Sequence, residues 1–350
     1  MTHLTVSLTA AGSHPAGWRL SPLPPLADIR ALREMARTAE RIGLDAILLG
    51  VPGSTPSDLL QFDPLPLLGA LIAATGTIGL SASWSIDFSE PYHVARVFAT
   101  LDHLAHGRTG WMPLLNTTAR LRPCIGKPGS PDDRADYSQR VAEFVDVTRK
   151  LWDSWQDQAW AMDKASGMFV DPEKVAPIHH GGAYFKVRGP LNVPRPPQGN
   201  PVVLIADPAE TALRRVVAEN ADVVLIRAAS QAEAAARTAE LRALAGHDIR
   251  VLADLLVILD DTTAEAQARA ATLDAMATTD LPRFVGTPAQ LAEMIAGWSG
   301  SCDGFNLLPA VLPYDLDGLA GLETQPPAGA SLRDHFRLTR PLSQYEGMPA

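Results

Sequence analysis

The residues with most capacity for chemistry are two adjacent histidines and two cysteines. His179 and His180 suggest a metal site, but they lie in a predicted loop without a cluster of carboxylates, which makes a poor ligand set. Cys124 and Cys302 are far apart and lack CxxC spacing, so neither a disulfide framework nor a cysteine-rich zinc site is expected. We therefore predict no metal site, and this cysteine usage favours a reducing cytoplasm.

Charge and composition favour a small-molecule partner. The 350 residues are 46% hydrophobic and 20% charged, which is typical of a soluble globular protein. A net charge of −9 and the scattered lysines argue against nucleic acid and anionic membranes as partners. Residues 1–13 lack a basic region, and the most apolar segment, 65–80, is broken by Pro66 and by glycines. No signal peptide and no membrane span are expected.

Residues 45–49 form a mostly apolar run of the kind found in strands buried on both faces of a parallel sheet, and eight segments in all are predicted strands. They are residues 4–8, 45–49, 78–83, 108–112, 202–205, 223–226, 251–258 and 304–308, with helical patterns between them. Strands separated by helices along a whole chain need right-handed crossovers. Eight such units over about 250 residues predict an α/β fold, a closed (β/α)8 TIM barrel. A doubly wound open sheet is the alternative.

Two excursions and a tail interrupt this alternation. Residues 113–131 and 163–198 contain repeated proline and glycine with little helical period. In a barrel such loops usually extend from the C-terminal face, where active sites lie. We expect one barrel domain over residues 1–323, and a C-terminal extension, 324–350, that wraps the barrel or a partner subunit.

The segment after the fifth predicted strand, Asp207-Pro208-Ala209-Glu210, has the residues of a helix start. Asp207 would be the N-cap, Pro208 the first helical residue and Glu210 the third, an arrangement like a capping box. Such a cap would satisfy the amides of the first helical turn internally.

Short sequence motifs along nearly the whole chain resemble those of a known protein family. They include Gly12-Ser13-His14-Pro15-Ala16-Gly17-Trp18-Arg19, Glu90-Pro91-Tyr92-His93-Val94-Ala95-Arg96, Leu151-Trp152-Asp153-Ser154-Trp155 and Phe284-Val285-Gly286-Thr287-Pro288. In their order and spacing the chain resembles the bacterial luciferase-like flavin-dependent monooxygenases, in particular the nitrilotriacetate and dibenzothiophene-sulfone monooxygenase branch. The chain is shorter than is usual for that branch, mostly because a helical insertion expected between Met276 and Phe284 is almost absent.

The resemblance implies an enzyme that binds FMN, reduced by a separate flavin reductase, and oxidises a small organic substrate. It also implies a homo-oligomer, a dimer or a tetramer. The alternative is a flavin-free homologue that acts as a partner subunit or binds another small ligand. A deazaflavin enzyme of the same superfamily is a further alternative, which the sequence does not separate from the first.

The same resemblance assigns positions around the flavin. The candidate cofactor-binding residues are Val51, Ser83, Met112, Tyr137, Asp207 and Ala209. Several depart from the family pattern: Val51 replaces an aspartate, Met112 an asparagine, Asp207 a glycine of the phosphate loop and Ala209 its serine. A carboxylate about 5 Å from the phosphate would repel each unit of its charge by roughly 3 kcal/mol at an effective dielectric of 20. Weak or absent FMN binding is therefore one expectation.

Two residues near the amino terminus are candidates for contact with the substrate. The resemblance places His14 and Trp18 at the mouth of the site, although they could equally hold the first loop against the barrel. No residue stands out as the catalytic base, and no motif identifies the substrate.

Overall fold

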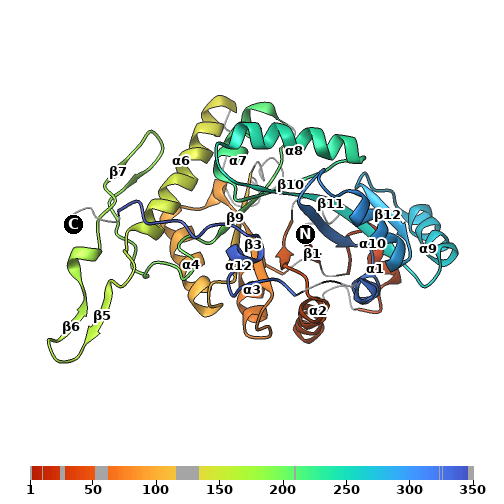
Figure 1. Ribbon diagram of the computed structural model, residues 1–350, viewed down its shortest axis with the longest axis horizontal. Coiled ribbons are helices and arrows are strands. Elements are labelled where there is room, and N and C mark those ends of the chain that lie inside the picture. Colours follow the sequence, from red (N-terminus) through yellow and green to blue (C-terminus); the bar gives the residue numbers. More distant parts are fainter. Residues whose placement is uncertain are drawn as a thin grey trace.

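The computed structural model describes residues 2–9, 11–23, 28–51, 62–115, 134–208, 210–322, 324 and 326–345. Eight parallel strands form a ring, in the order β1 (His3–Leu8), β2 (Ala46–Leu49), β3 (Gly79–Ser85), β4 (Thr109–Leu114), β9 (Val202–Ala206), β10 (Val223–Ile226), β11 (Arg250–Leu259) and β13 (Gly304–Pro309). β13 pairs with β1, and β10 pairs with β11, so the ring is closed. The predicted (β/α)8 barrel is confirmed and the open sheet is excluded (Figure 1).

Helices alternate with the strands around the outside of the barrel, except for the last one, which lies at the amino-terminal end of the barrel. They are α1 (Gly17–Leu20), α2 (Ile29–Ile42), α3 (Pro64–Ile72), α4 (Pro91–Leu104), α6 (Arg134–Asp153), α7 (Thr211–Asn220), α8 (Gln231–Ala245), α9 (Thr263–Met276), α10 (Pro288–Gly297), α11 (Tyr314–Gly318) and α12 (Leu332–His335), with short 3-10 turns at η1 (Ile86–Phe88), η3 (Pro172–Lys174) and η4 (Leu319–Gly321). Asp28 caps α2, and Gly43 ends it in the left-handed conformation. Within the described ranges, every helix is too short or too polar to cross a bilayer.

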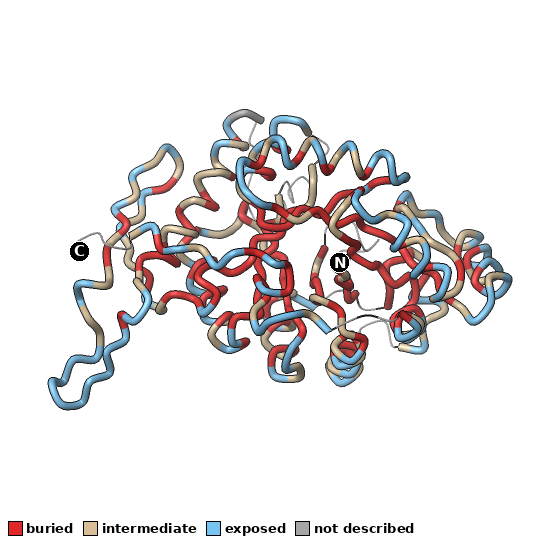
Figure 2. The backbone as a smooth tube through the Cα atoms, in the orientation of Figure 1, coloured by how far each residue is buried: buried red, intermediate tan, exposed pale blue. Residues whose placement is uncertain are grey.

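The strands divide their side chains between two apolar cores. Ile47 and Val203 face outward into a large core shared with the helices, whereas Leu48, Leu204 and Leu225 face the barrel interior. Figure 2 shows the buried residues concentrated in the barrel wall. The most apolar strands, such as β9 and β10, have this composition because both of their faces are buried.

Between α6 and β9 the chain leaves the barrel in two antiparallel hairpins. β5 (Trp160–Asp163) pairs with β6 (Met168–Val170), and β7 (His180–Gly181) pairs with β8 (Lys186–Val187). Both hairpins project beyond the end of the molecule that carries α4 and α6 (Figure 1). Another short strand, β12 (Arg283–Gly286), pairs with the C-terminal part of β11, residues 256–259. The expected excursion at 163–198 falls within this region, and most of 113–131 lies outside the described residues.

The C-terminal extension closes the amino-terminal end of the barrel. Leu332 on α12, Phe336 and Leu338 join the interior core there. The guanidinium of Arg333 pairs with the Asp222 carboxylate, with 3.0 Å between Nη2 and Oδ2. Burial opposes ionisation of Asp222, but the charges of Arg333 and its other arginine neighbour outweigh it and hold its pKa below the ordinary value. The extension therefore supplies the floor of the barrel.

Candidate functional site

The C-terminal ends of β2, β3 and β4 bring three of the candidate cofactor positions together. Ser83 is opposite Met112 in the register of β3 and β4, and Val51 follows the end of β2. All three are at most 4% exposed, and Val51 and Met112 belong to the interior core. Gly50, with a φ of +76°, packs tightly here, because a Cβ would come within 2.2 Å of the Ser83 Oγ. Val51 and Met112 therefore form an apolar wall at the C-terminal end of the barrel, and the Ser83 hydroxyl lies within this wall.

The remaining candidate cofactor positions are placed differently. Tyr137 lies in the first turn of α6 and is 2% exposed, in the outer core rather than in the barrel interior. Ala209 lies outside the described residues. Asp207 follows β9, and its amide continues the strand ladder by donating to the Leu225 carbonyl. Tyr137 therefore does not join the wall formed by β2 to β4.

Asp207 connects β9 to two helices through a network of ion pairs. Its side chain, 5% exposed, accepts a hydrogen bond from Nε of Arg214 on α7 at 3.0 Å and another from Nη1 of Arg237 on α8. Glu240 lies 3.0 Å from Arg214 and 3.2 Å from Arg237. Burial works against the charge of Arg214, but the two carboxylates outweigh it and raise the pKa of its guanidinium. Asp207 is thus an ion-pair partner and not a helix cap.

The predicted capping box at Asp207 is therefore wrong. Helix α7 begins at Thr211, its N-cap is Glu210, and the side chain of that N-cap makes no capping hydrogen bond. The physical reason is that Asp207 still belongs to the strand ladder, so the helix starts later than the local sequence suggests. The expected repulsion of a phosphate is also reduced, because two guanidinium groups balance the charge of Asp207.

Replacing Arg214 by alanine is expected to lower the free energy of unfolding by roughly 1–3 kcal/mol, because two carboxylates lose a donor in a mostly buried position. The neighbouring Arg215 provides a matched control. Its side chain is 71% exposed and pairs with Glu219, so its alanine variant should change stability by less than about 0.5 kcal/mol. Urea denaturation compares the two variants, and equal losses would contradict a stabilising network.

The amino end of α7 offers hydrogen-bond donors for an anion. The N-cap side chain does not use the first-turn amides, and the guanidinium groups of Arg214 and Arg237 lie beside the preceding loop. The donor set fits a phosphate group. Those two guanidinium groups already pair with two carboxylates, Asp207 and Glu240, so these four side chains carry no net charge. The site thus lacks the excess positive charge that favours tight binding of a dianion.

The two candidate substrate residues have opposite environments. The His14 side chain is 0% exposed, its Nδ1 accepts a hydrogen bond from the Ala16 amide at 3.1 Å, and its Nε2 lies 3.7 Å from Asp274 on α9. Burial lowers the pKa of His14, although Asp274 acts in the opposite direction. Trp18 on α1 is 55% exposed. The structure therefore does not place both side chains on one accessible surface, and their contact with a substrate stays a prediction.

The second of the adjacent histidines, His180, contacts helix α6. Nε2 of His180 lies 3.1 Å from the carboxylate of Glu143 on α6, which also accepts hydrogen bonds from the amides of Tyr184 and Phe185. These contacts hold the β7–β8 hairpin against α6. Throughout the part of the chain that the structure describes, no three histidine, cysteine or acidic side chains are arranged to hold a metal ion.

The sequence analysis missed a buried acid in the middle of a barrel strand. Asp254 on β11, 4% exposed, accepts a hydrogen bond from Nδ2 of Asn306 on β13 at 2.7 Å. Its other oxygen lies 3.8 Å from Nε of Arg227, the residue after β10. Burial raises the pKa of Asp254 to about 6, although Asn306 and Arg227 act in the opposite direction. The sequence did contain an indication of this site, because Asp254 is the single acidic residue within the otherwise apolar run 251–259.

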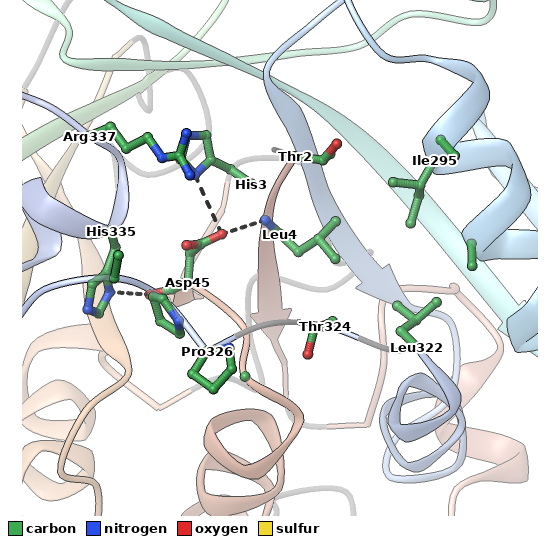
Figure 3. Close-up of a pocket in the computed structure, with 15 residues that line it drawn as sticks. Thr2, His3, Leu4, Asp45, Ile295, Leu322, Thr324, Pro326, His335 and Arg337 are labelled. Carbon is green, nitrogen blue, oxygen red and sulfur yellow. Dashed lines mark hydrogen bonds and ion pairs between the residues drawn. The ribbon is translucent and has the colours of Figure 1, made fainter.

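A cavity of about 390 Å³ lies at the opposite end of the barrel, between β1, α10 and the C-terminal extension (Figure 3). Figure 3 shows Asp45 between His3 and His335 on its polar side. Nδ1 of His335 donates to the backbone oxygen of Asp45 at 3.0 Å, and burial lowers the pKa of this imidazole. The cavity therefore marks the attachment of the extension, away from the C-terminal face where barrel active sites form.

Comparison with known proteins extends over the whole chain. The model of the luciferase-like monooxygenase family matches residues 2–296. N-acetyl-S-(2-succino)cysteine monooxygenase of Bacillus subtilis (strain 168) is 31% identical over 432 aligned positions, which cover 98% of each chain. That alignment is longer than the 350 residues of this chain, so the Bacillus protein contains tens of residues that this chain lacks.

Two further relatives agree with the sequence resemblance. Nitrilotriacetate monooxygenase component A of Aminobacter aminovorans is 37% identical over 61% of this chain and 51% of its own length. The crystal structure of DmoA from Hyphomicrobium sulfonivorans superposes with a TM-score of 0.85 at 23% identity, covering 95% of this chain and 91% of that one. The resemblance read from the short motifs is confirmed, and the structural match independently supports the fold.

Proposed function

Since the chain belongs to the luciferase-like monooxygenase family, we propose that it is a flavin-dependent monooxygenase that oxidises a small organic molecule with reduced FMN from a separate reductase. The observation that carries the proposal is the alignment that covers 98% of this chain and 98% of a named monooxygenase. The Bacillus and Aminobacter relatives are named for different substrates, so the substrate of this chain is not assigned from them. The proposed enzyme acts in the cytoplasm as a homo-oligomer.

The chain's own residues would hold and shield the cofactor. We assign the apolar wall of Val51 and Met112 to excluding water from the flavin ring, with the Ser83 hydroxyl as a polar contact in that wall. The amides at the start of α7 and the Arg214 and Arg237 guanidinium groups would receive the phosphate. FMN itself, when bound, supplies the redox chemistry.

Binding of FMN tests the proposal without a known substrate. Calorimetry with oxidised FMN, and anaerobic titration with reduced FMN, should each show saturable binding to the full chain. Riboflavin is the matched control, because it lacks only the phosphate. We expect FMN to bind less than about tenfold more tightly than riboflavin, since the net charge near α7 does not favour a dianion. If neither redox form of FMN binds saturably, the proposal fails.

A second candidate is a flavin-free homologue that serves as a partner subunit or binds another small ligand. The observation in its favour is the charge balance beside α7, where the guanidinium groups of Arg214 and Arg237 are already paired with the carboxylates of Asp207 and Glu240. Asp207→Gly combined with Ala209→Ser would restore the residue types that the family resemblance leads one to expect. A gain in FMN affinity over an inert wild type would support this candidate. Wild-type protein that purifies yellow with bound flavin would refute it.

A further inference from the structure

Arg227 is a cationic side chain at the C-terminal end of the barrel, and the phosphate contacts assigned above do not include it. It is the first residue after β10, and its side chain is 48% exposed. Val223 and Leu225, the alternate residues before it, both belong to the interior core of the barrel. Because alternate residues of a strand share a face, Arg227 continues this row on the inner side of the barrel.

The end of β10 is next to the end of β9, which leads into α7. Leu225 is opposite Ala206 in the register of the two strands, and its carbonyl accepts the hydrogen bond of the Asp207 amide. Arg227 is two residues further along β10. It therefore lies opposite the segment that connects β9 with α7, where the phosphate is assigned.

The position of Arg227 differs from that of the two arginines already assigned to the phosphate. Arg214 and Arg237 belong to α7 and α8, on the outside of the barrel, and both pair with Asp207. Arg227 approaches the same segment from the inner side, so it would supply a positive charge that Asp207 does not neutralise.

A buried carboxylate competes for the guanidinium of Arg227. Ile226 is opposite Ala253 in the register of β10 and β11, and Asp254 is the next residue along β11. Oδ2 of Asp254 lies 3.8 Å from Nε of Arg227, which is an ion pair too long for a hydrogen bond. Burial raises the pKa of Asp254 to about 6, so at about pH 8 the carboxylate is ionised and neutralises Arg227.

Hydrogen bonds fix Asp254 in place on its other side. Its Oδ1 accepts a hydrogen bond from Nδ2 of Asn306 at 2.7 Å. Oδ1 of Asn306 accepts from the hydroxyls of Thr5 at 3.1 Å and Ser7 at 3.3 Å, which sets the orientation of the amide. All of these side chains are buried, whereas Arg227 is about half exposed. Arg227 is therefore the partner that is able to turn toward a ligand.

We propose that Arg227 binds the phosphate of the cofactor and that Asp254 weakens this contact by competing for the same guanidinium. The proposal rests on the proposed function, because it concerns the same flavin site. A phosphate dianion offers two negative charges and paired acceptor oxygens, where Asp254 offers one charge at a long distance. Loss of Arg227 and loss of the Asp254 charge are therefore expected to change FMN affinity in opposite directions.

Calorimetry on the full chain near pH 8, with FMN and with riboflavin, tests the proposal. Arg227→Gln should weaken FMN binding at least about fivefold, and Asp254→Asn should strengthen it at least about threefold. Each variant should leave riboflavin binding within about twofold of the wild type, because riboflavin lacks the phosphate. Arg227→Lys, which keeps the charge but loses the paired donors, should retain part of the FMN preference.

Two exposed residues provide controls with the same changes of charge. Arg215→Gln removes a guanidinium from a side chain that is 71% exposed on α7, and Asp261→Asn removes an exposed carboxylate. Both should leave the ratio of FMN to riboflavin affinity unchanged. Circular dichroism confirms that each variant is folded.

The outcomes distinguish this proposal from the proposed function. Saturable FMN binding that Arg227→Gln leaves unchanged, or that it weakens equally with riboflavin binding, would overturn the role of Arg227 and leave the proposed function intact. Weaker FMN binding by Asp254→Asn would overturn the competition. If FMN binds to none of the proteins, wild type included, both proposals fail.

Discussion

Replacing Phe336 by alanine is expected to lower the free energy of unfolding by about 3–5 kcal/mol. The ring is 0% exposed and belongs to the core at the amino-terminal end of the barrel interior. It also meets the ring of His3 edge to face, with 5.5 Å between centroids. The extension backbone is fixed there by Arg250, whose Nε donates to the Phe336 carbonyl at 2.9 Å. The remaining side chains are therefore poorly able to fill the cavity that alanine would leave.

The matched control lies on the same extension. Leu342 is 76% exposed, so Leu342→Ala should change stability by less than about 0.5 kcal/mol. Urea denaturation followed by circular dichroism measures both variants, with the midpoint as the primary readout. A Phe336→Ala midpoint that coincides with that of the control would show that the extension is not part of the cooperative core.

The second large effect is a dependence of stability on pH caused by Asp254. Burial raises its pKa from the ordinary 3.8 to about 6, so the folded protein binds the proton more tightly than the unfolded chain does. The stabilisation by this proton is complete below pH 3.8 and is lost as the pH rises through about 6. A difference of about two pKa units corresponds to about 3 kcal/mol.

Asp254→Asn should remove this dependence, because asparagine keeps an acceptor for Asn306 but carries no charge. We expect the variant to be about 3 kcal/mol more stable than the wild type near pH 8 and similar to it near pH 4. Asp261→Asn, at an exposed aspartate, is the control and should change stability little at either pH. An advantage of Asp254→Asn that is the same at both pH values would contradict the assigned titration.

The strands were predictable because their sequence pattern is local. Runs such as 202–205 and 223–226 are apolar on both faces, and that composition requires a sheet covered on both sides. The ends of α2 at Asp28 and Gly43 also depend on short-range interactions, since a cap acts on amides or carbonyls within one turn. The convergence of Val51, Ser83 and Met112 then follows, because parallel strands in one barrel end at the same face.

Asp207 shows where local reasoning failed. Its sequence neighbours favour a helix cap, but its amide pairs with the Leu225 carbonyl and its carboxylate meets Arg214 and Arg237 from two helices. Arg237 is 30 residues away along the chain, so no short window contains the interaction. The same holds for Asp254, whose partner Asn306 is 52 residues away.

The sequence by itself determined the strand and helix order, the closed barrel and the family, because each depends on composition and periodicity over short windows or on their order along the chain. The tertiary structure alone decided the ionic environment of Asp207, the burial of Asp254, the floor supplied by Phe336 and the exposure of the β5–β6 hairpin. Charge pairing and burial depend on distances between residues far apart in sequence, and those distances exist only once the barrel has closed.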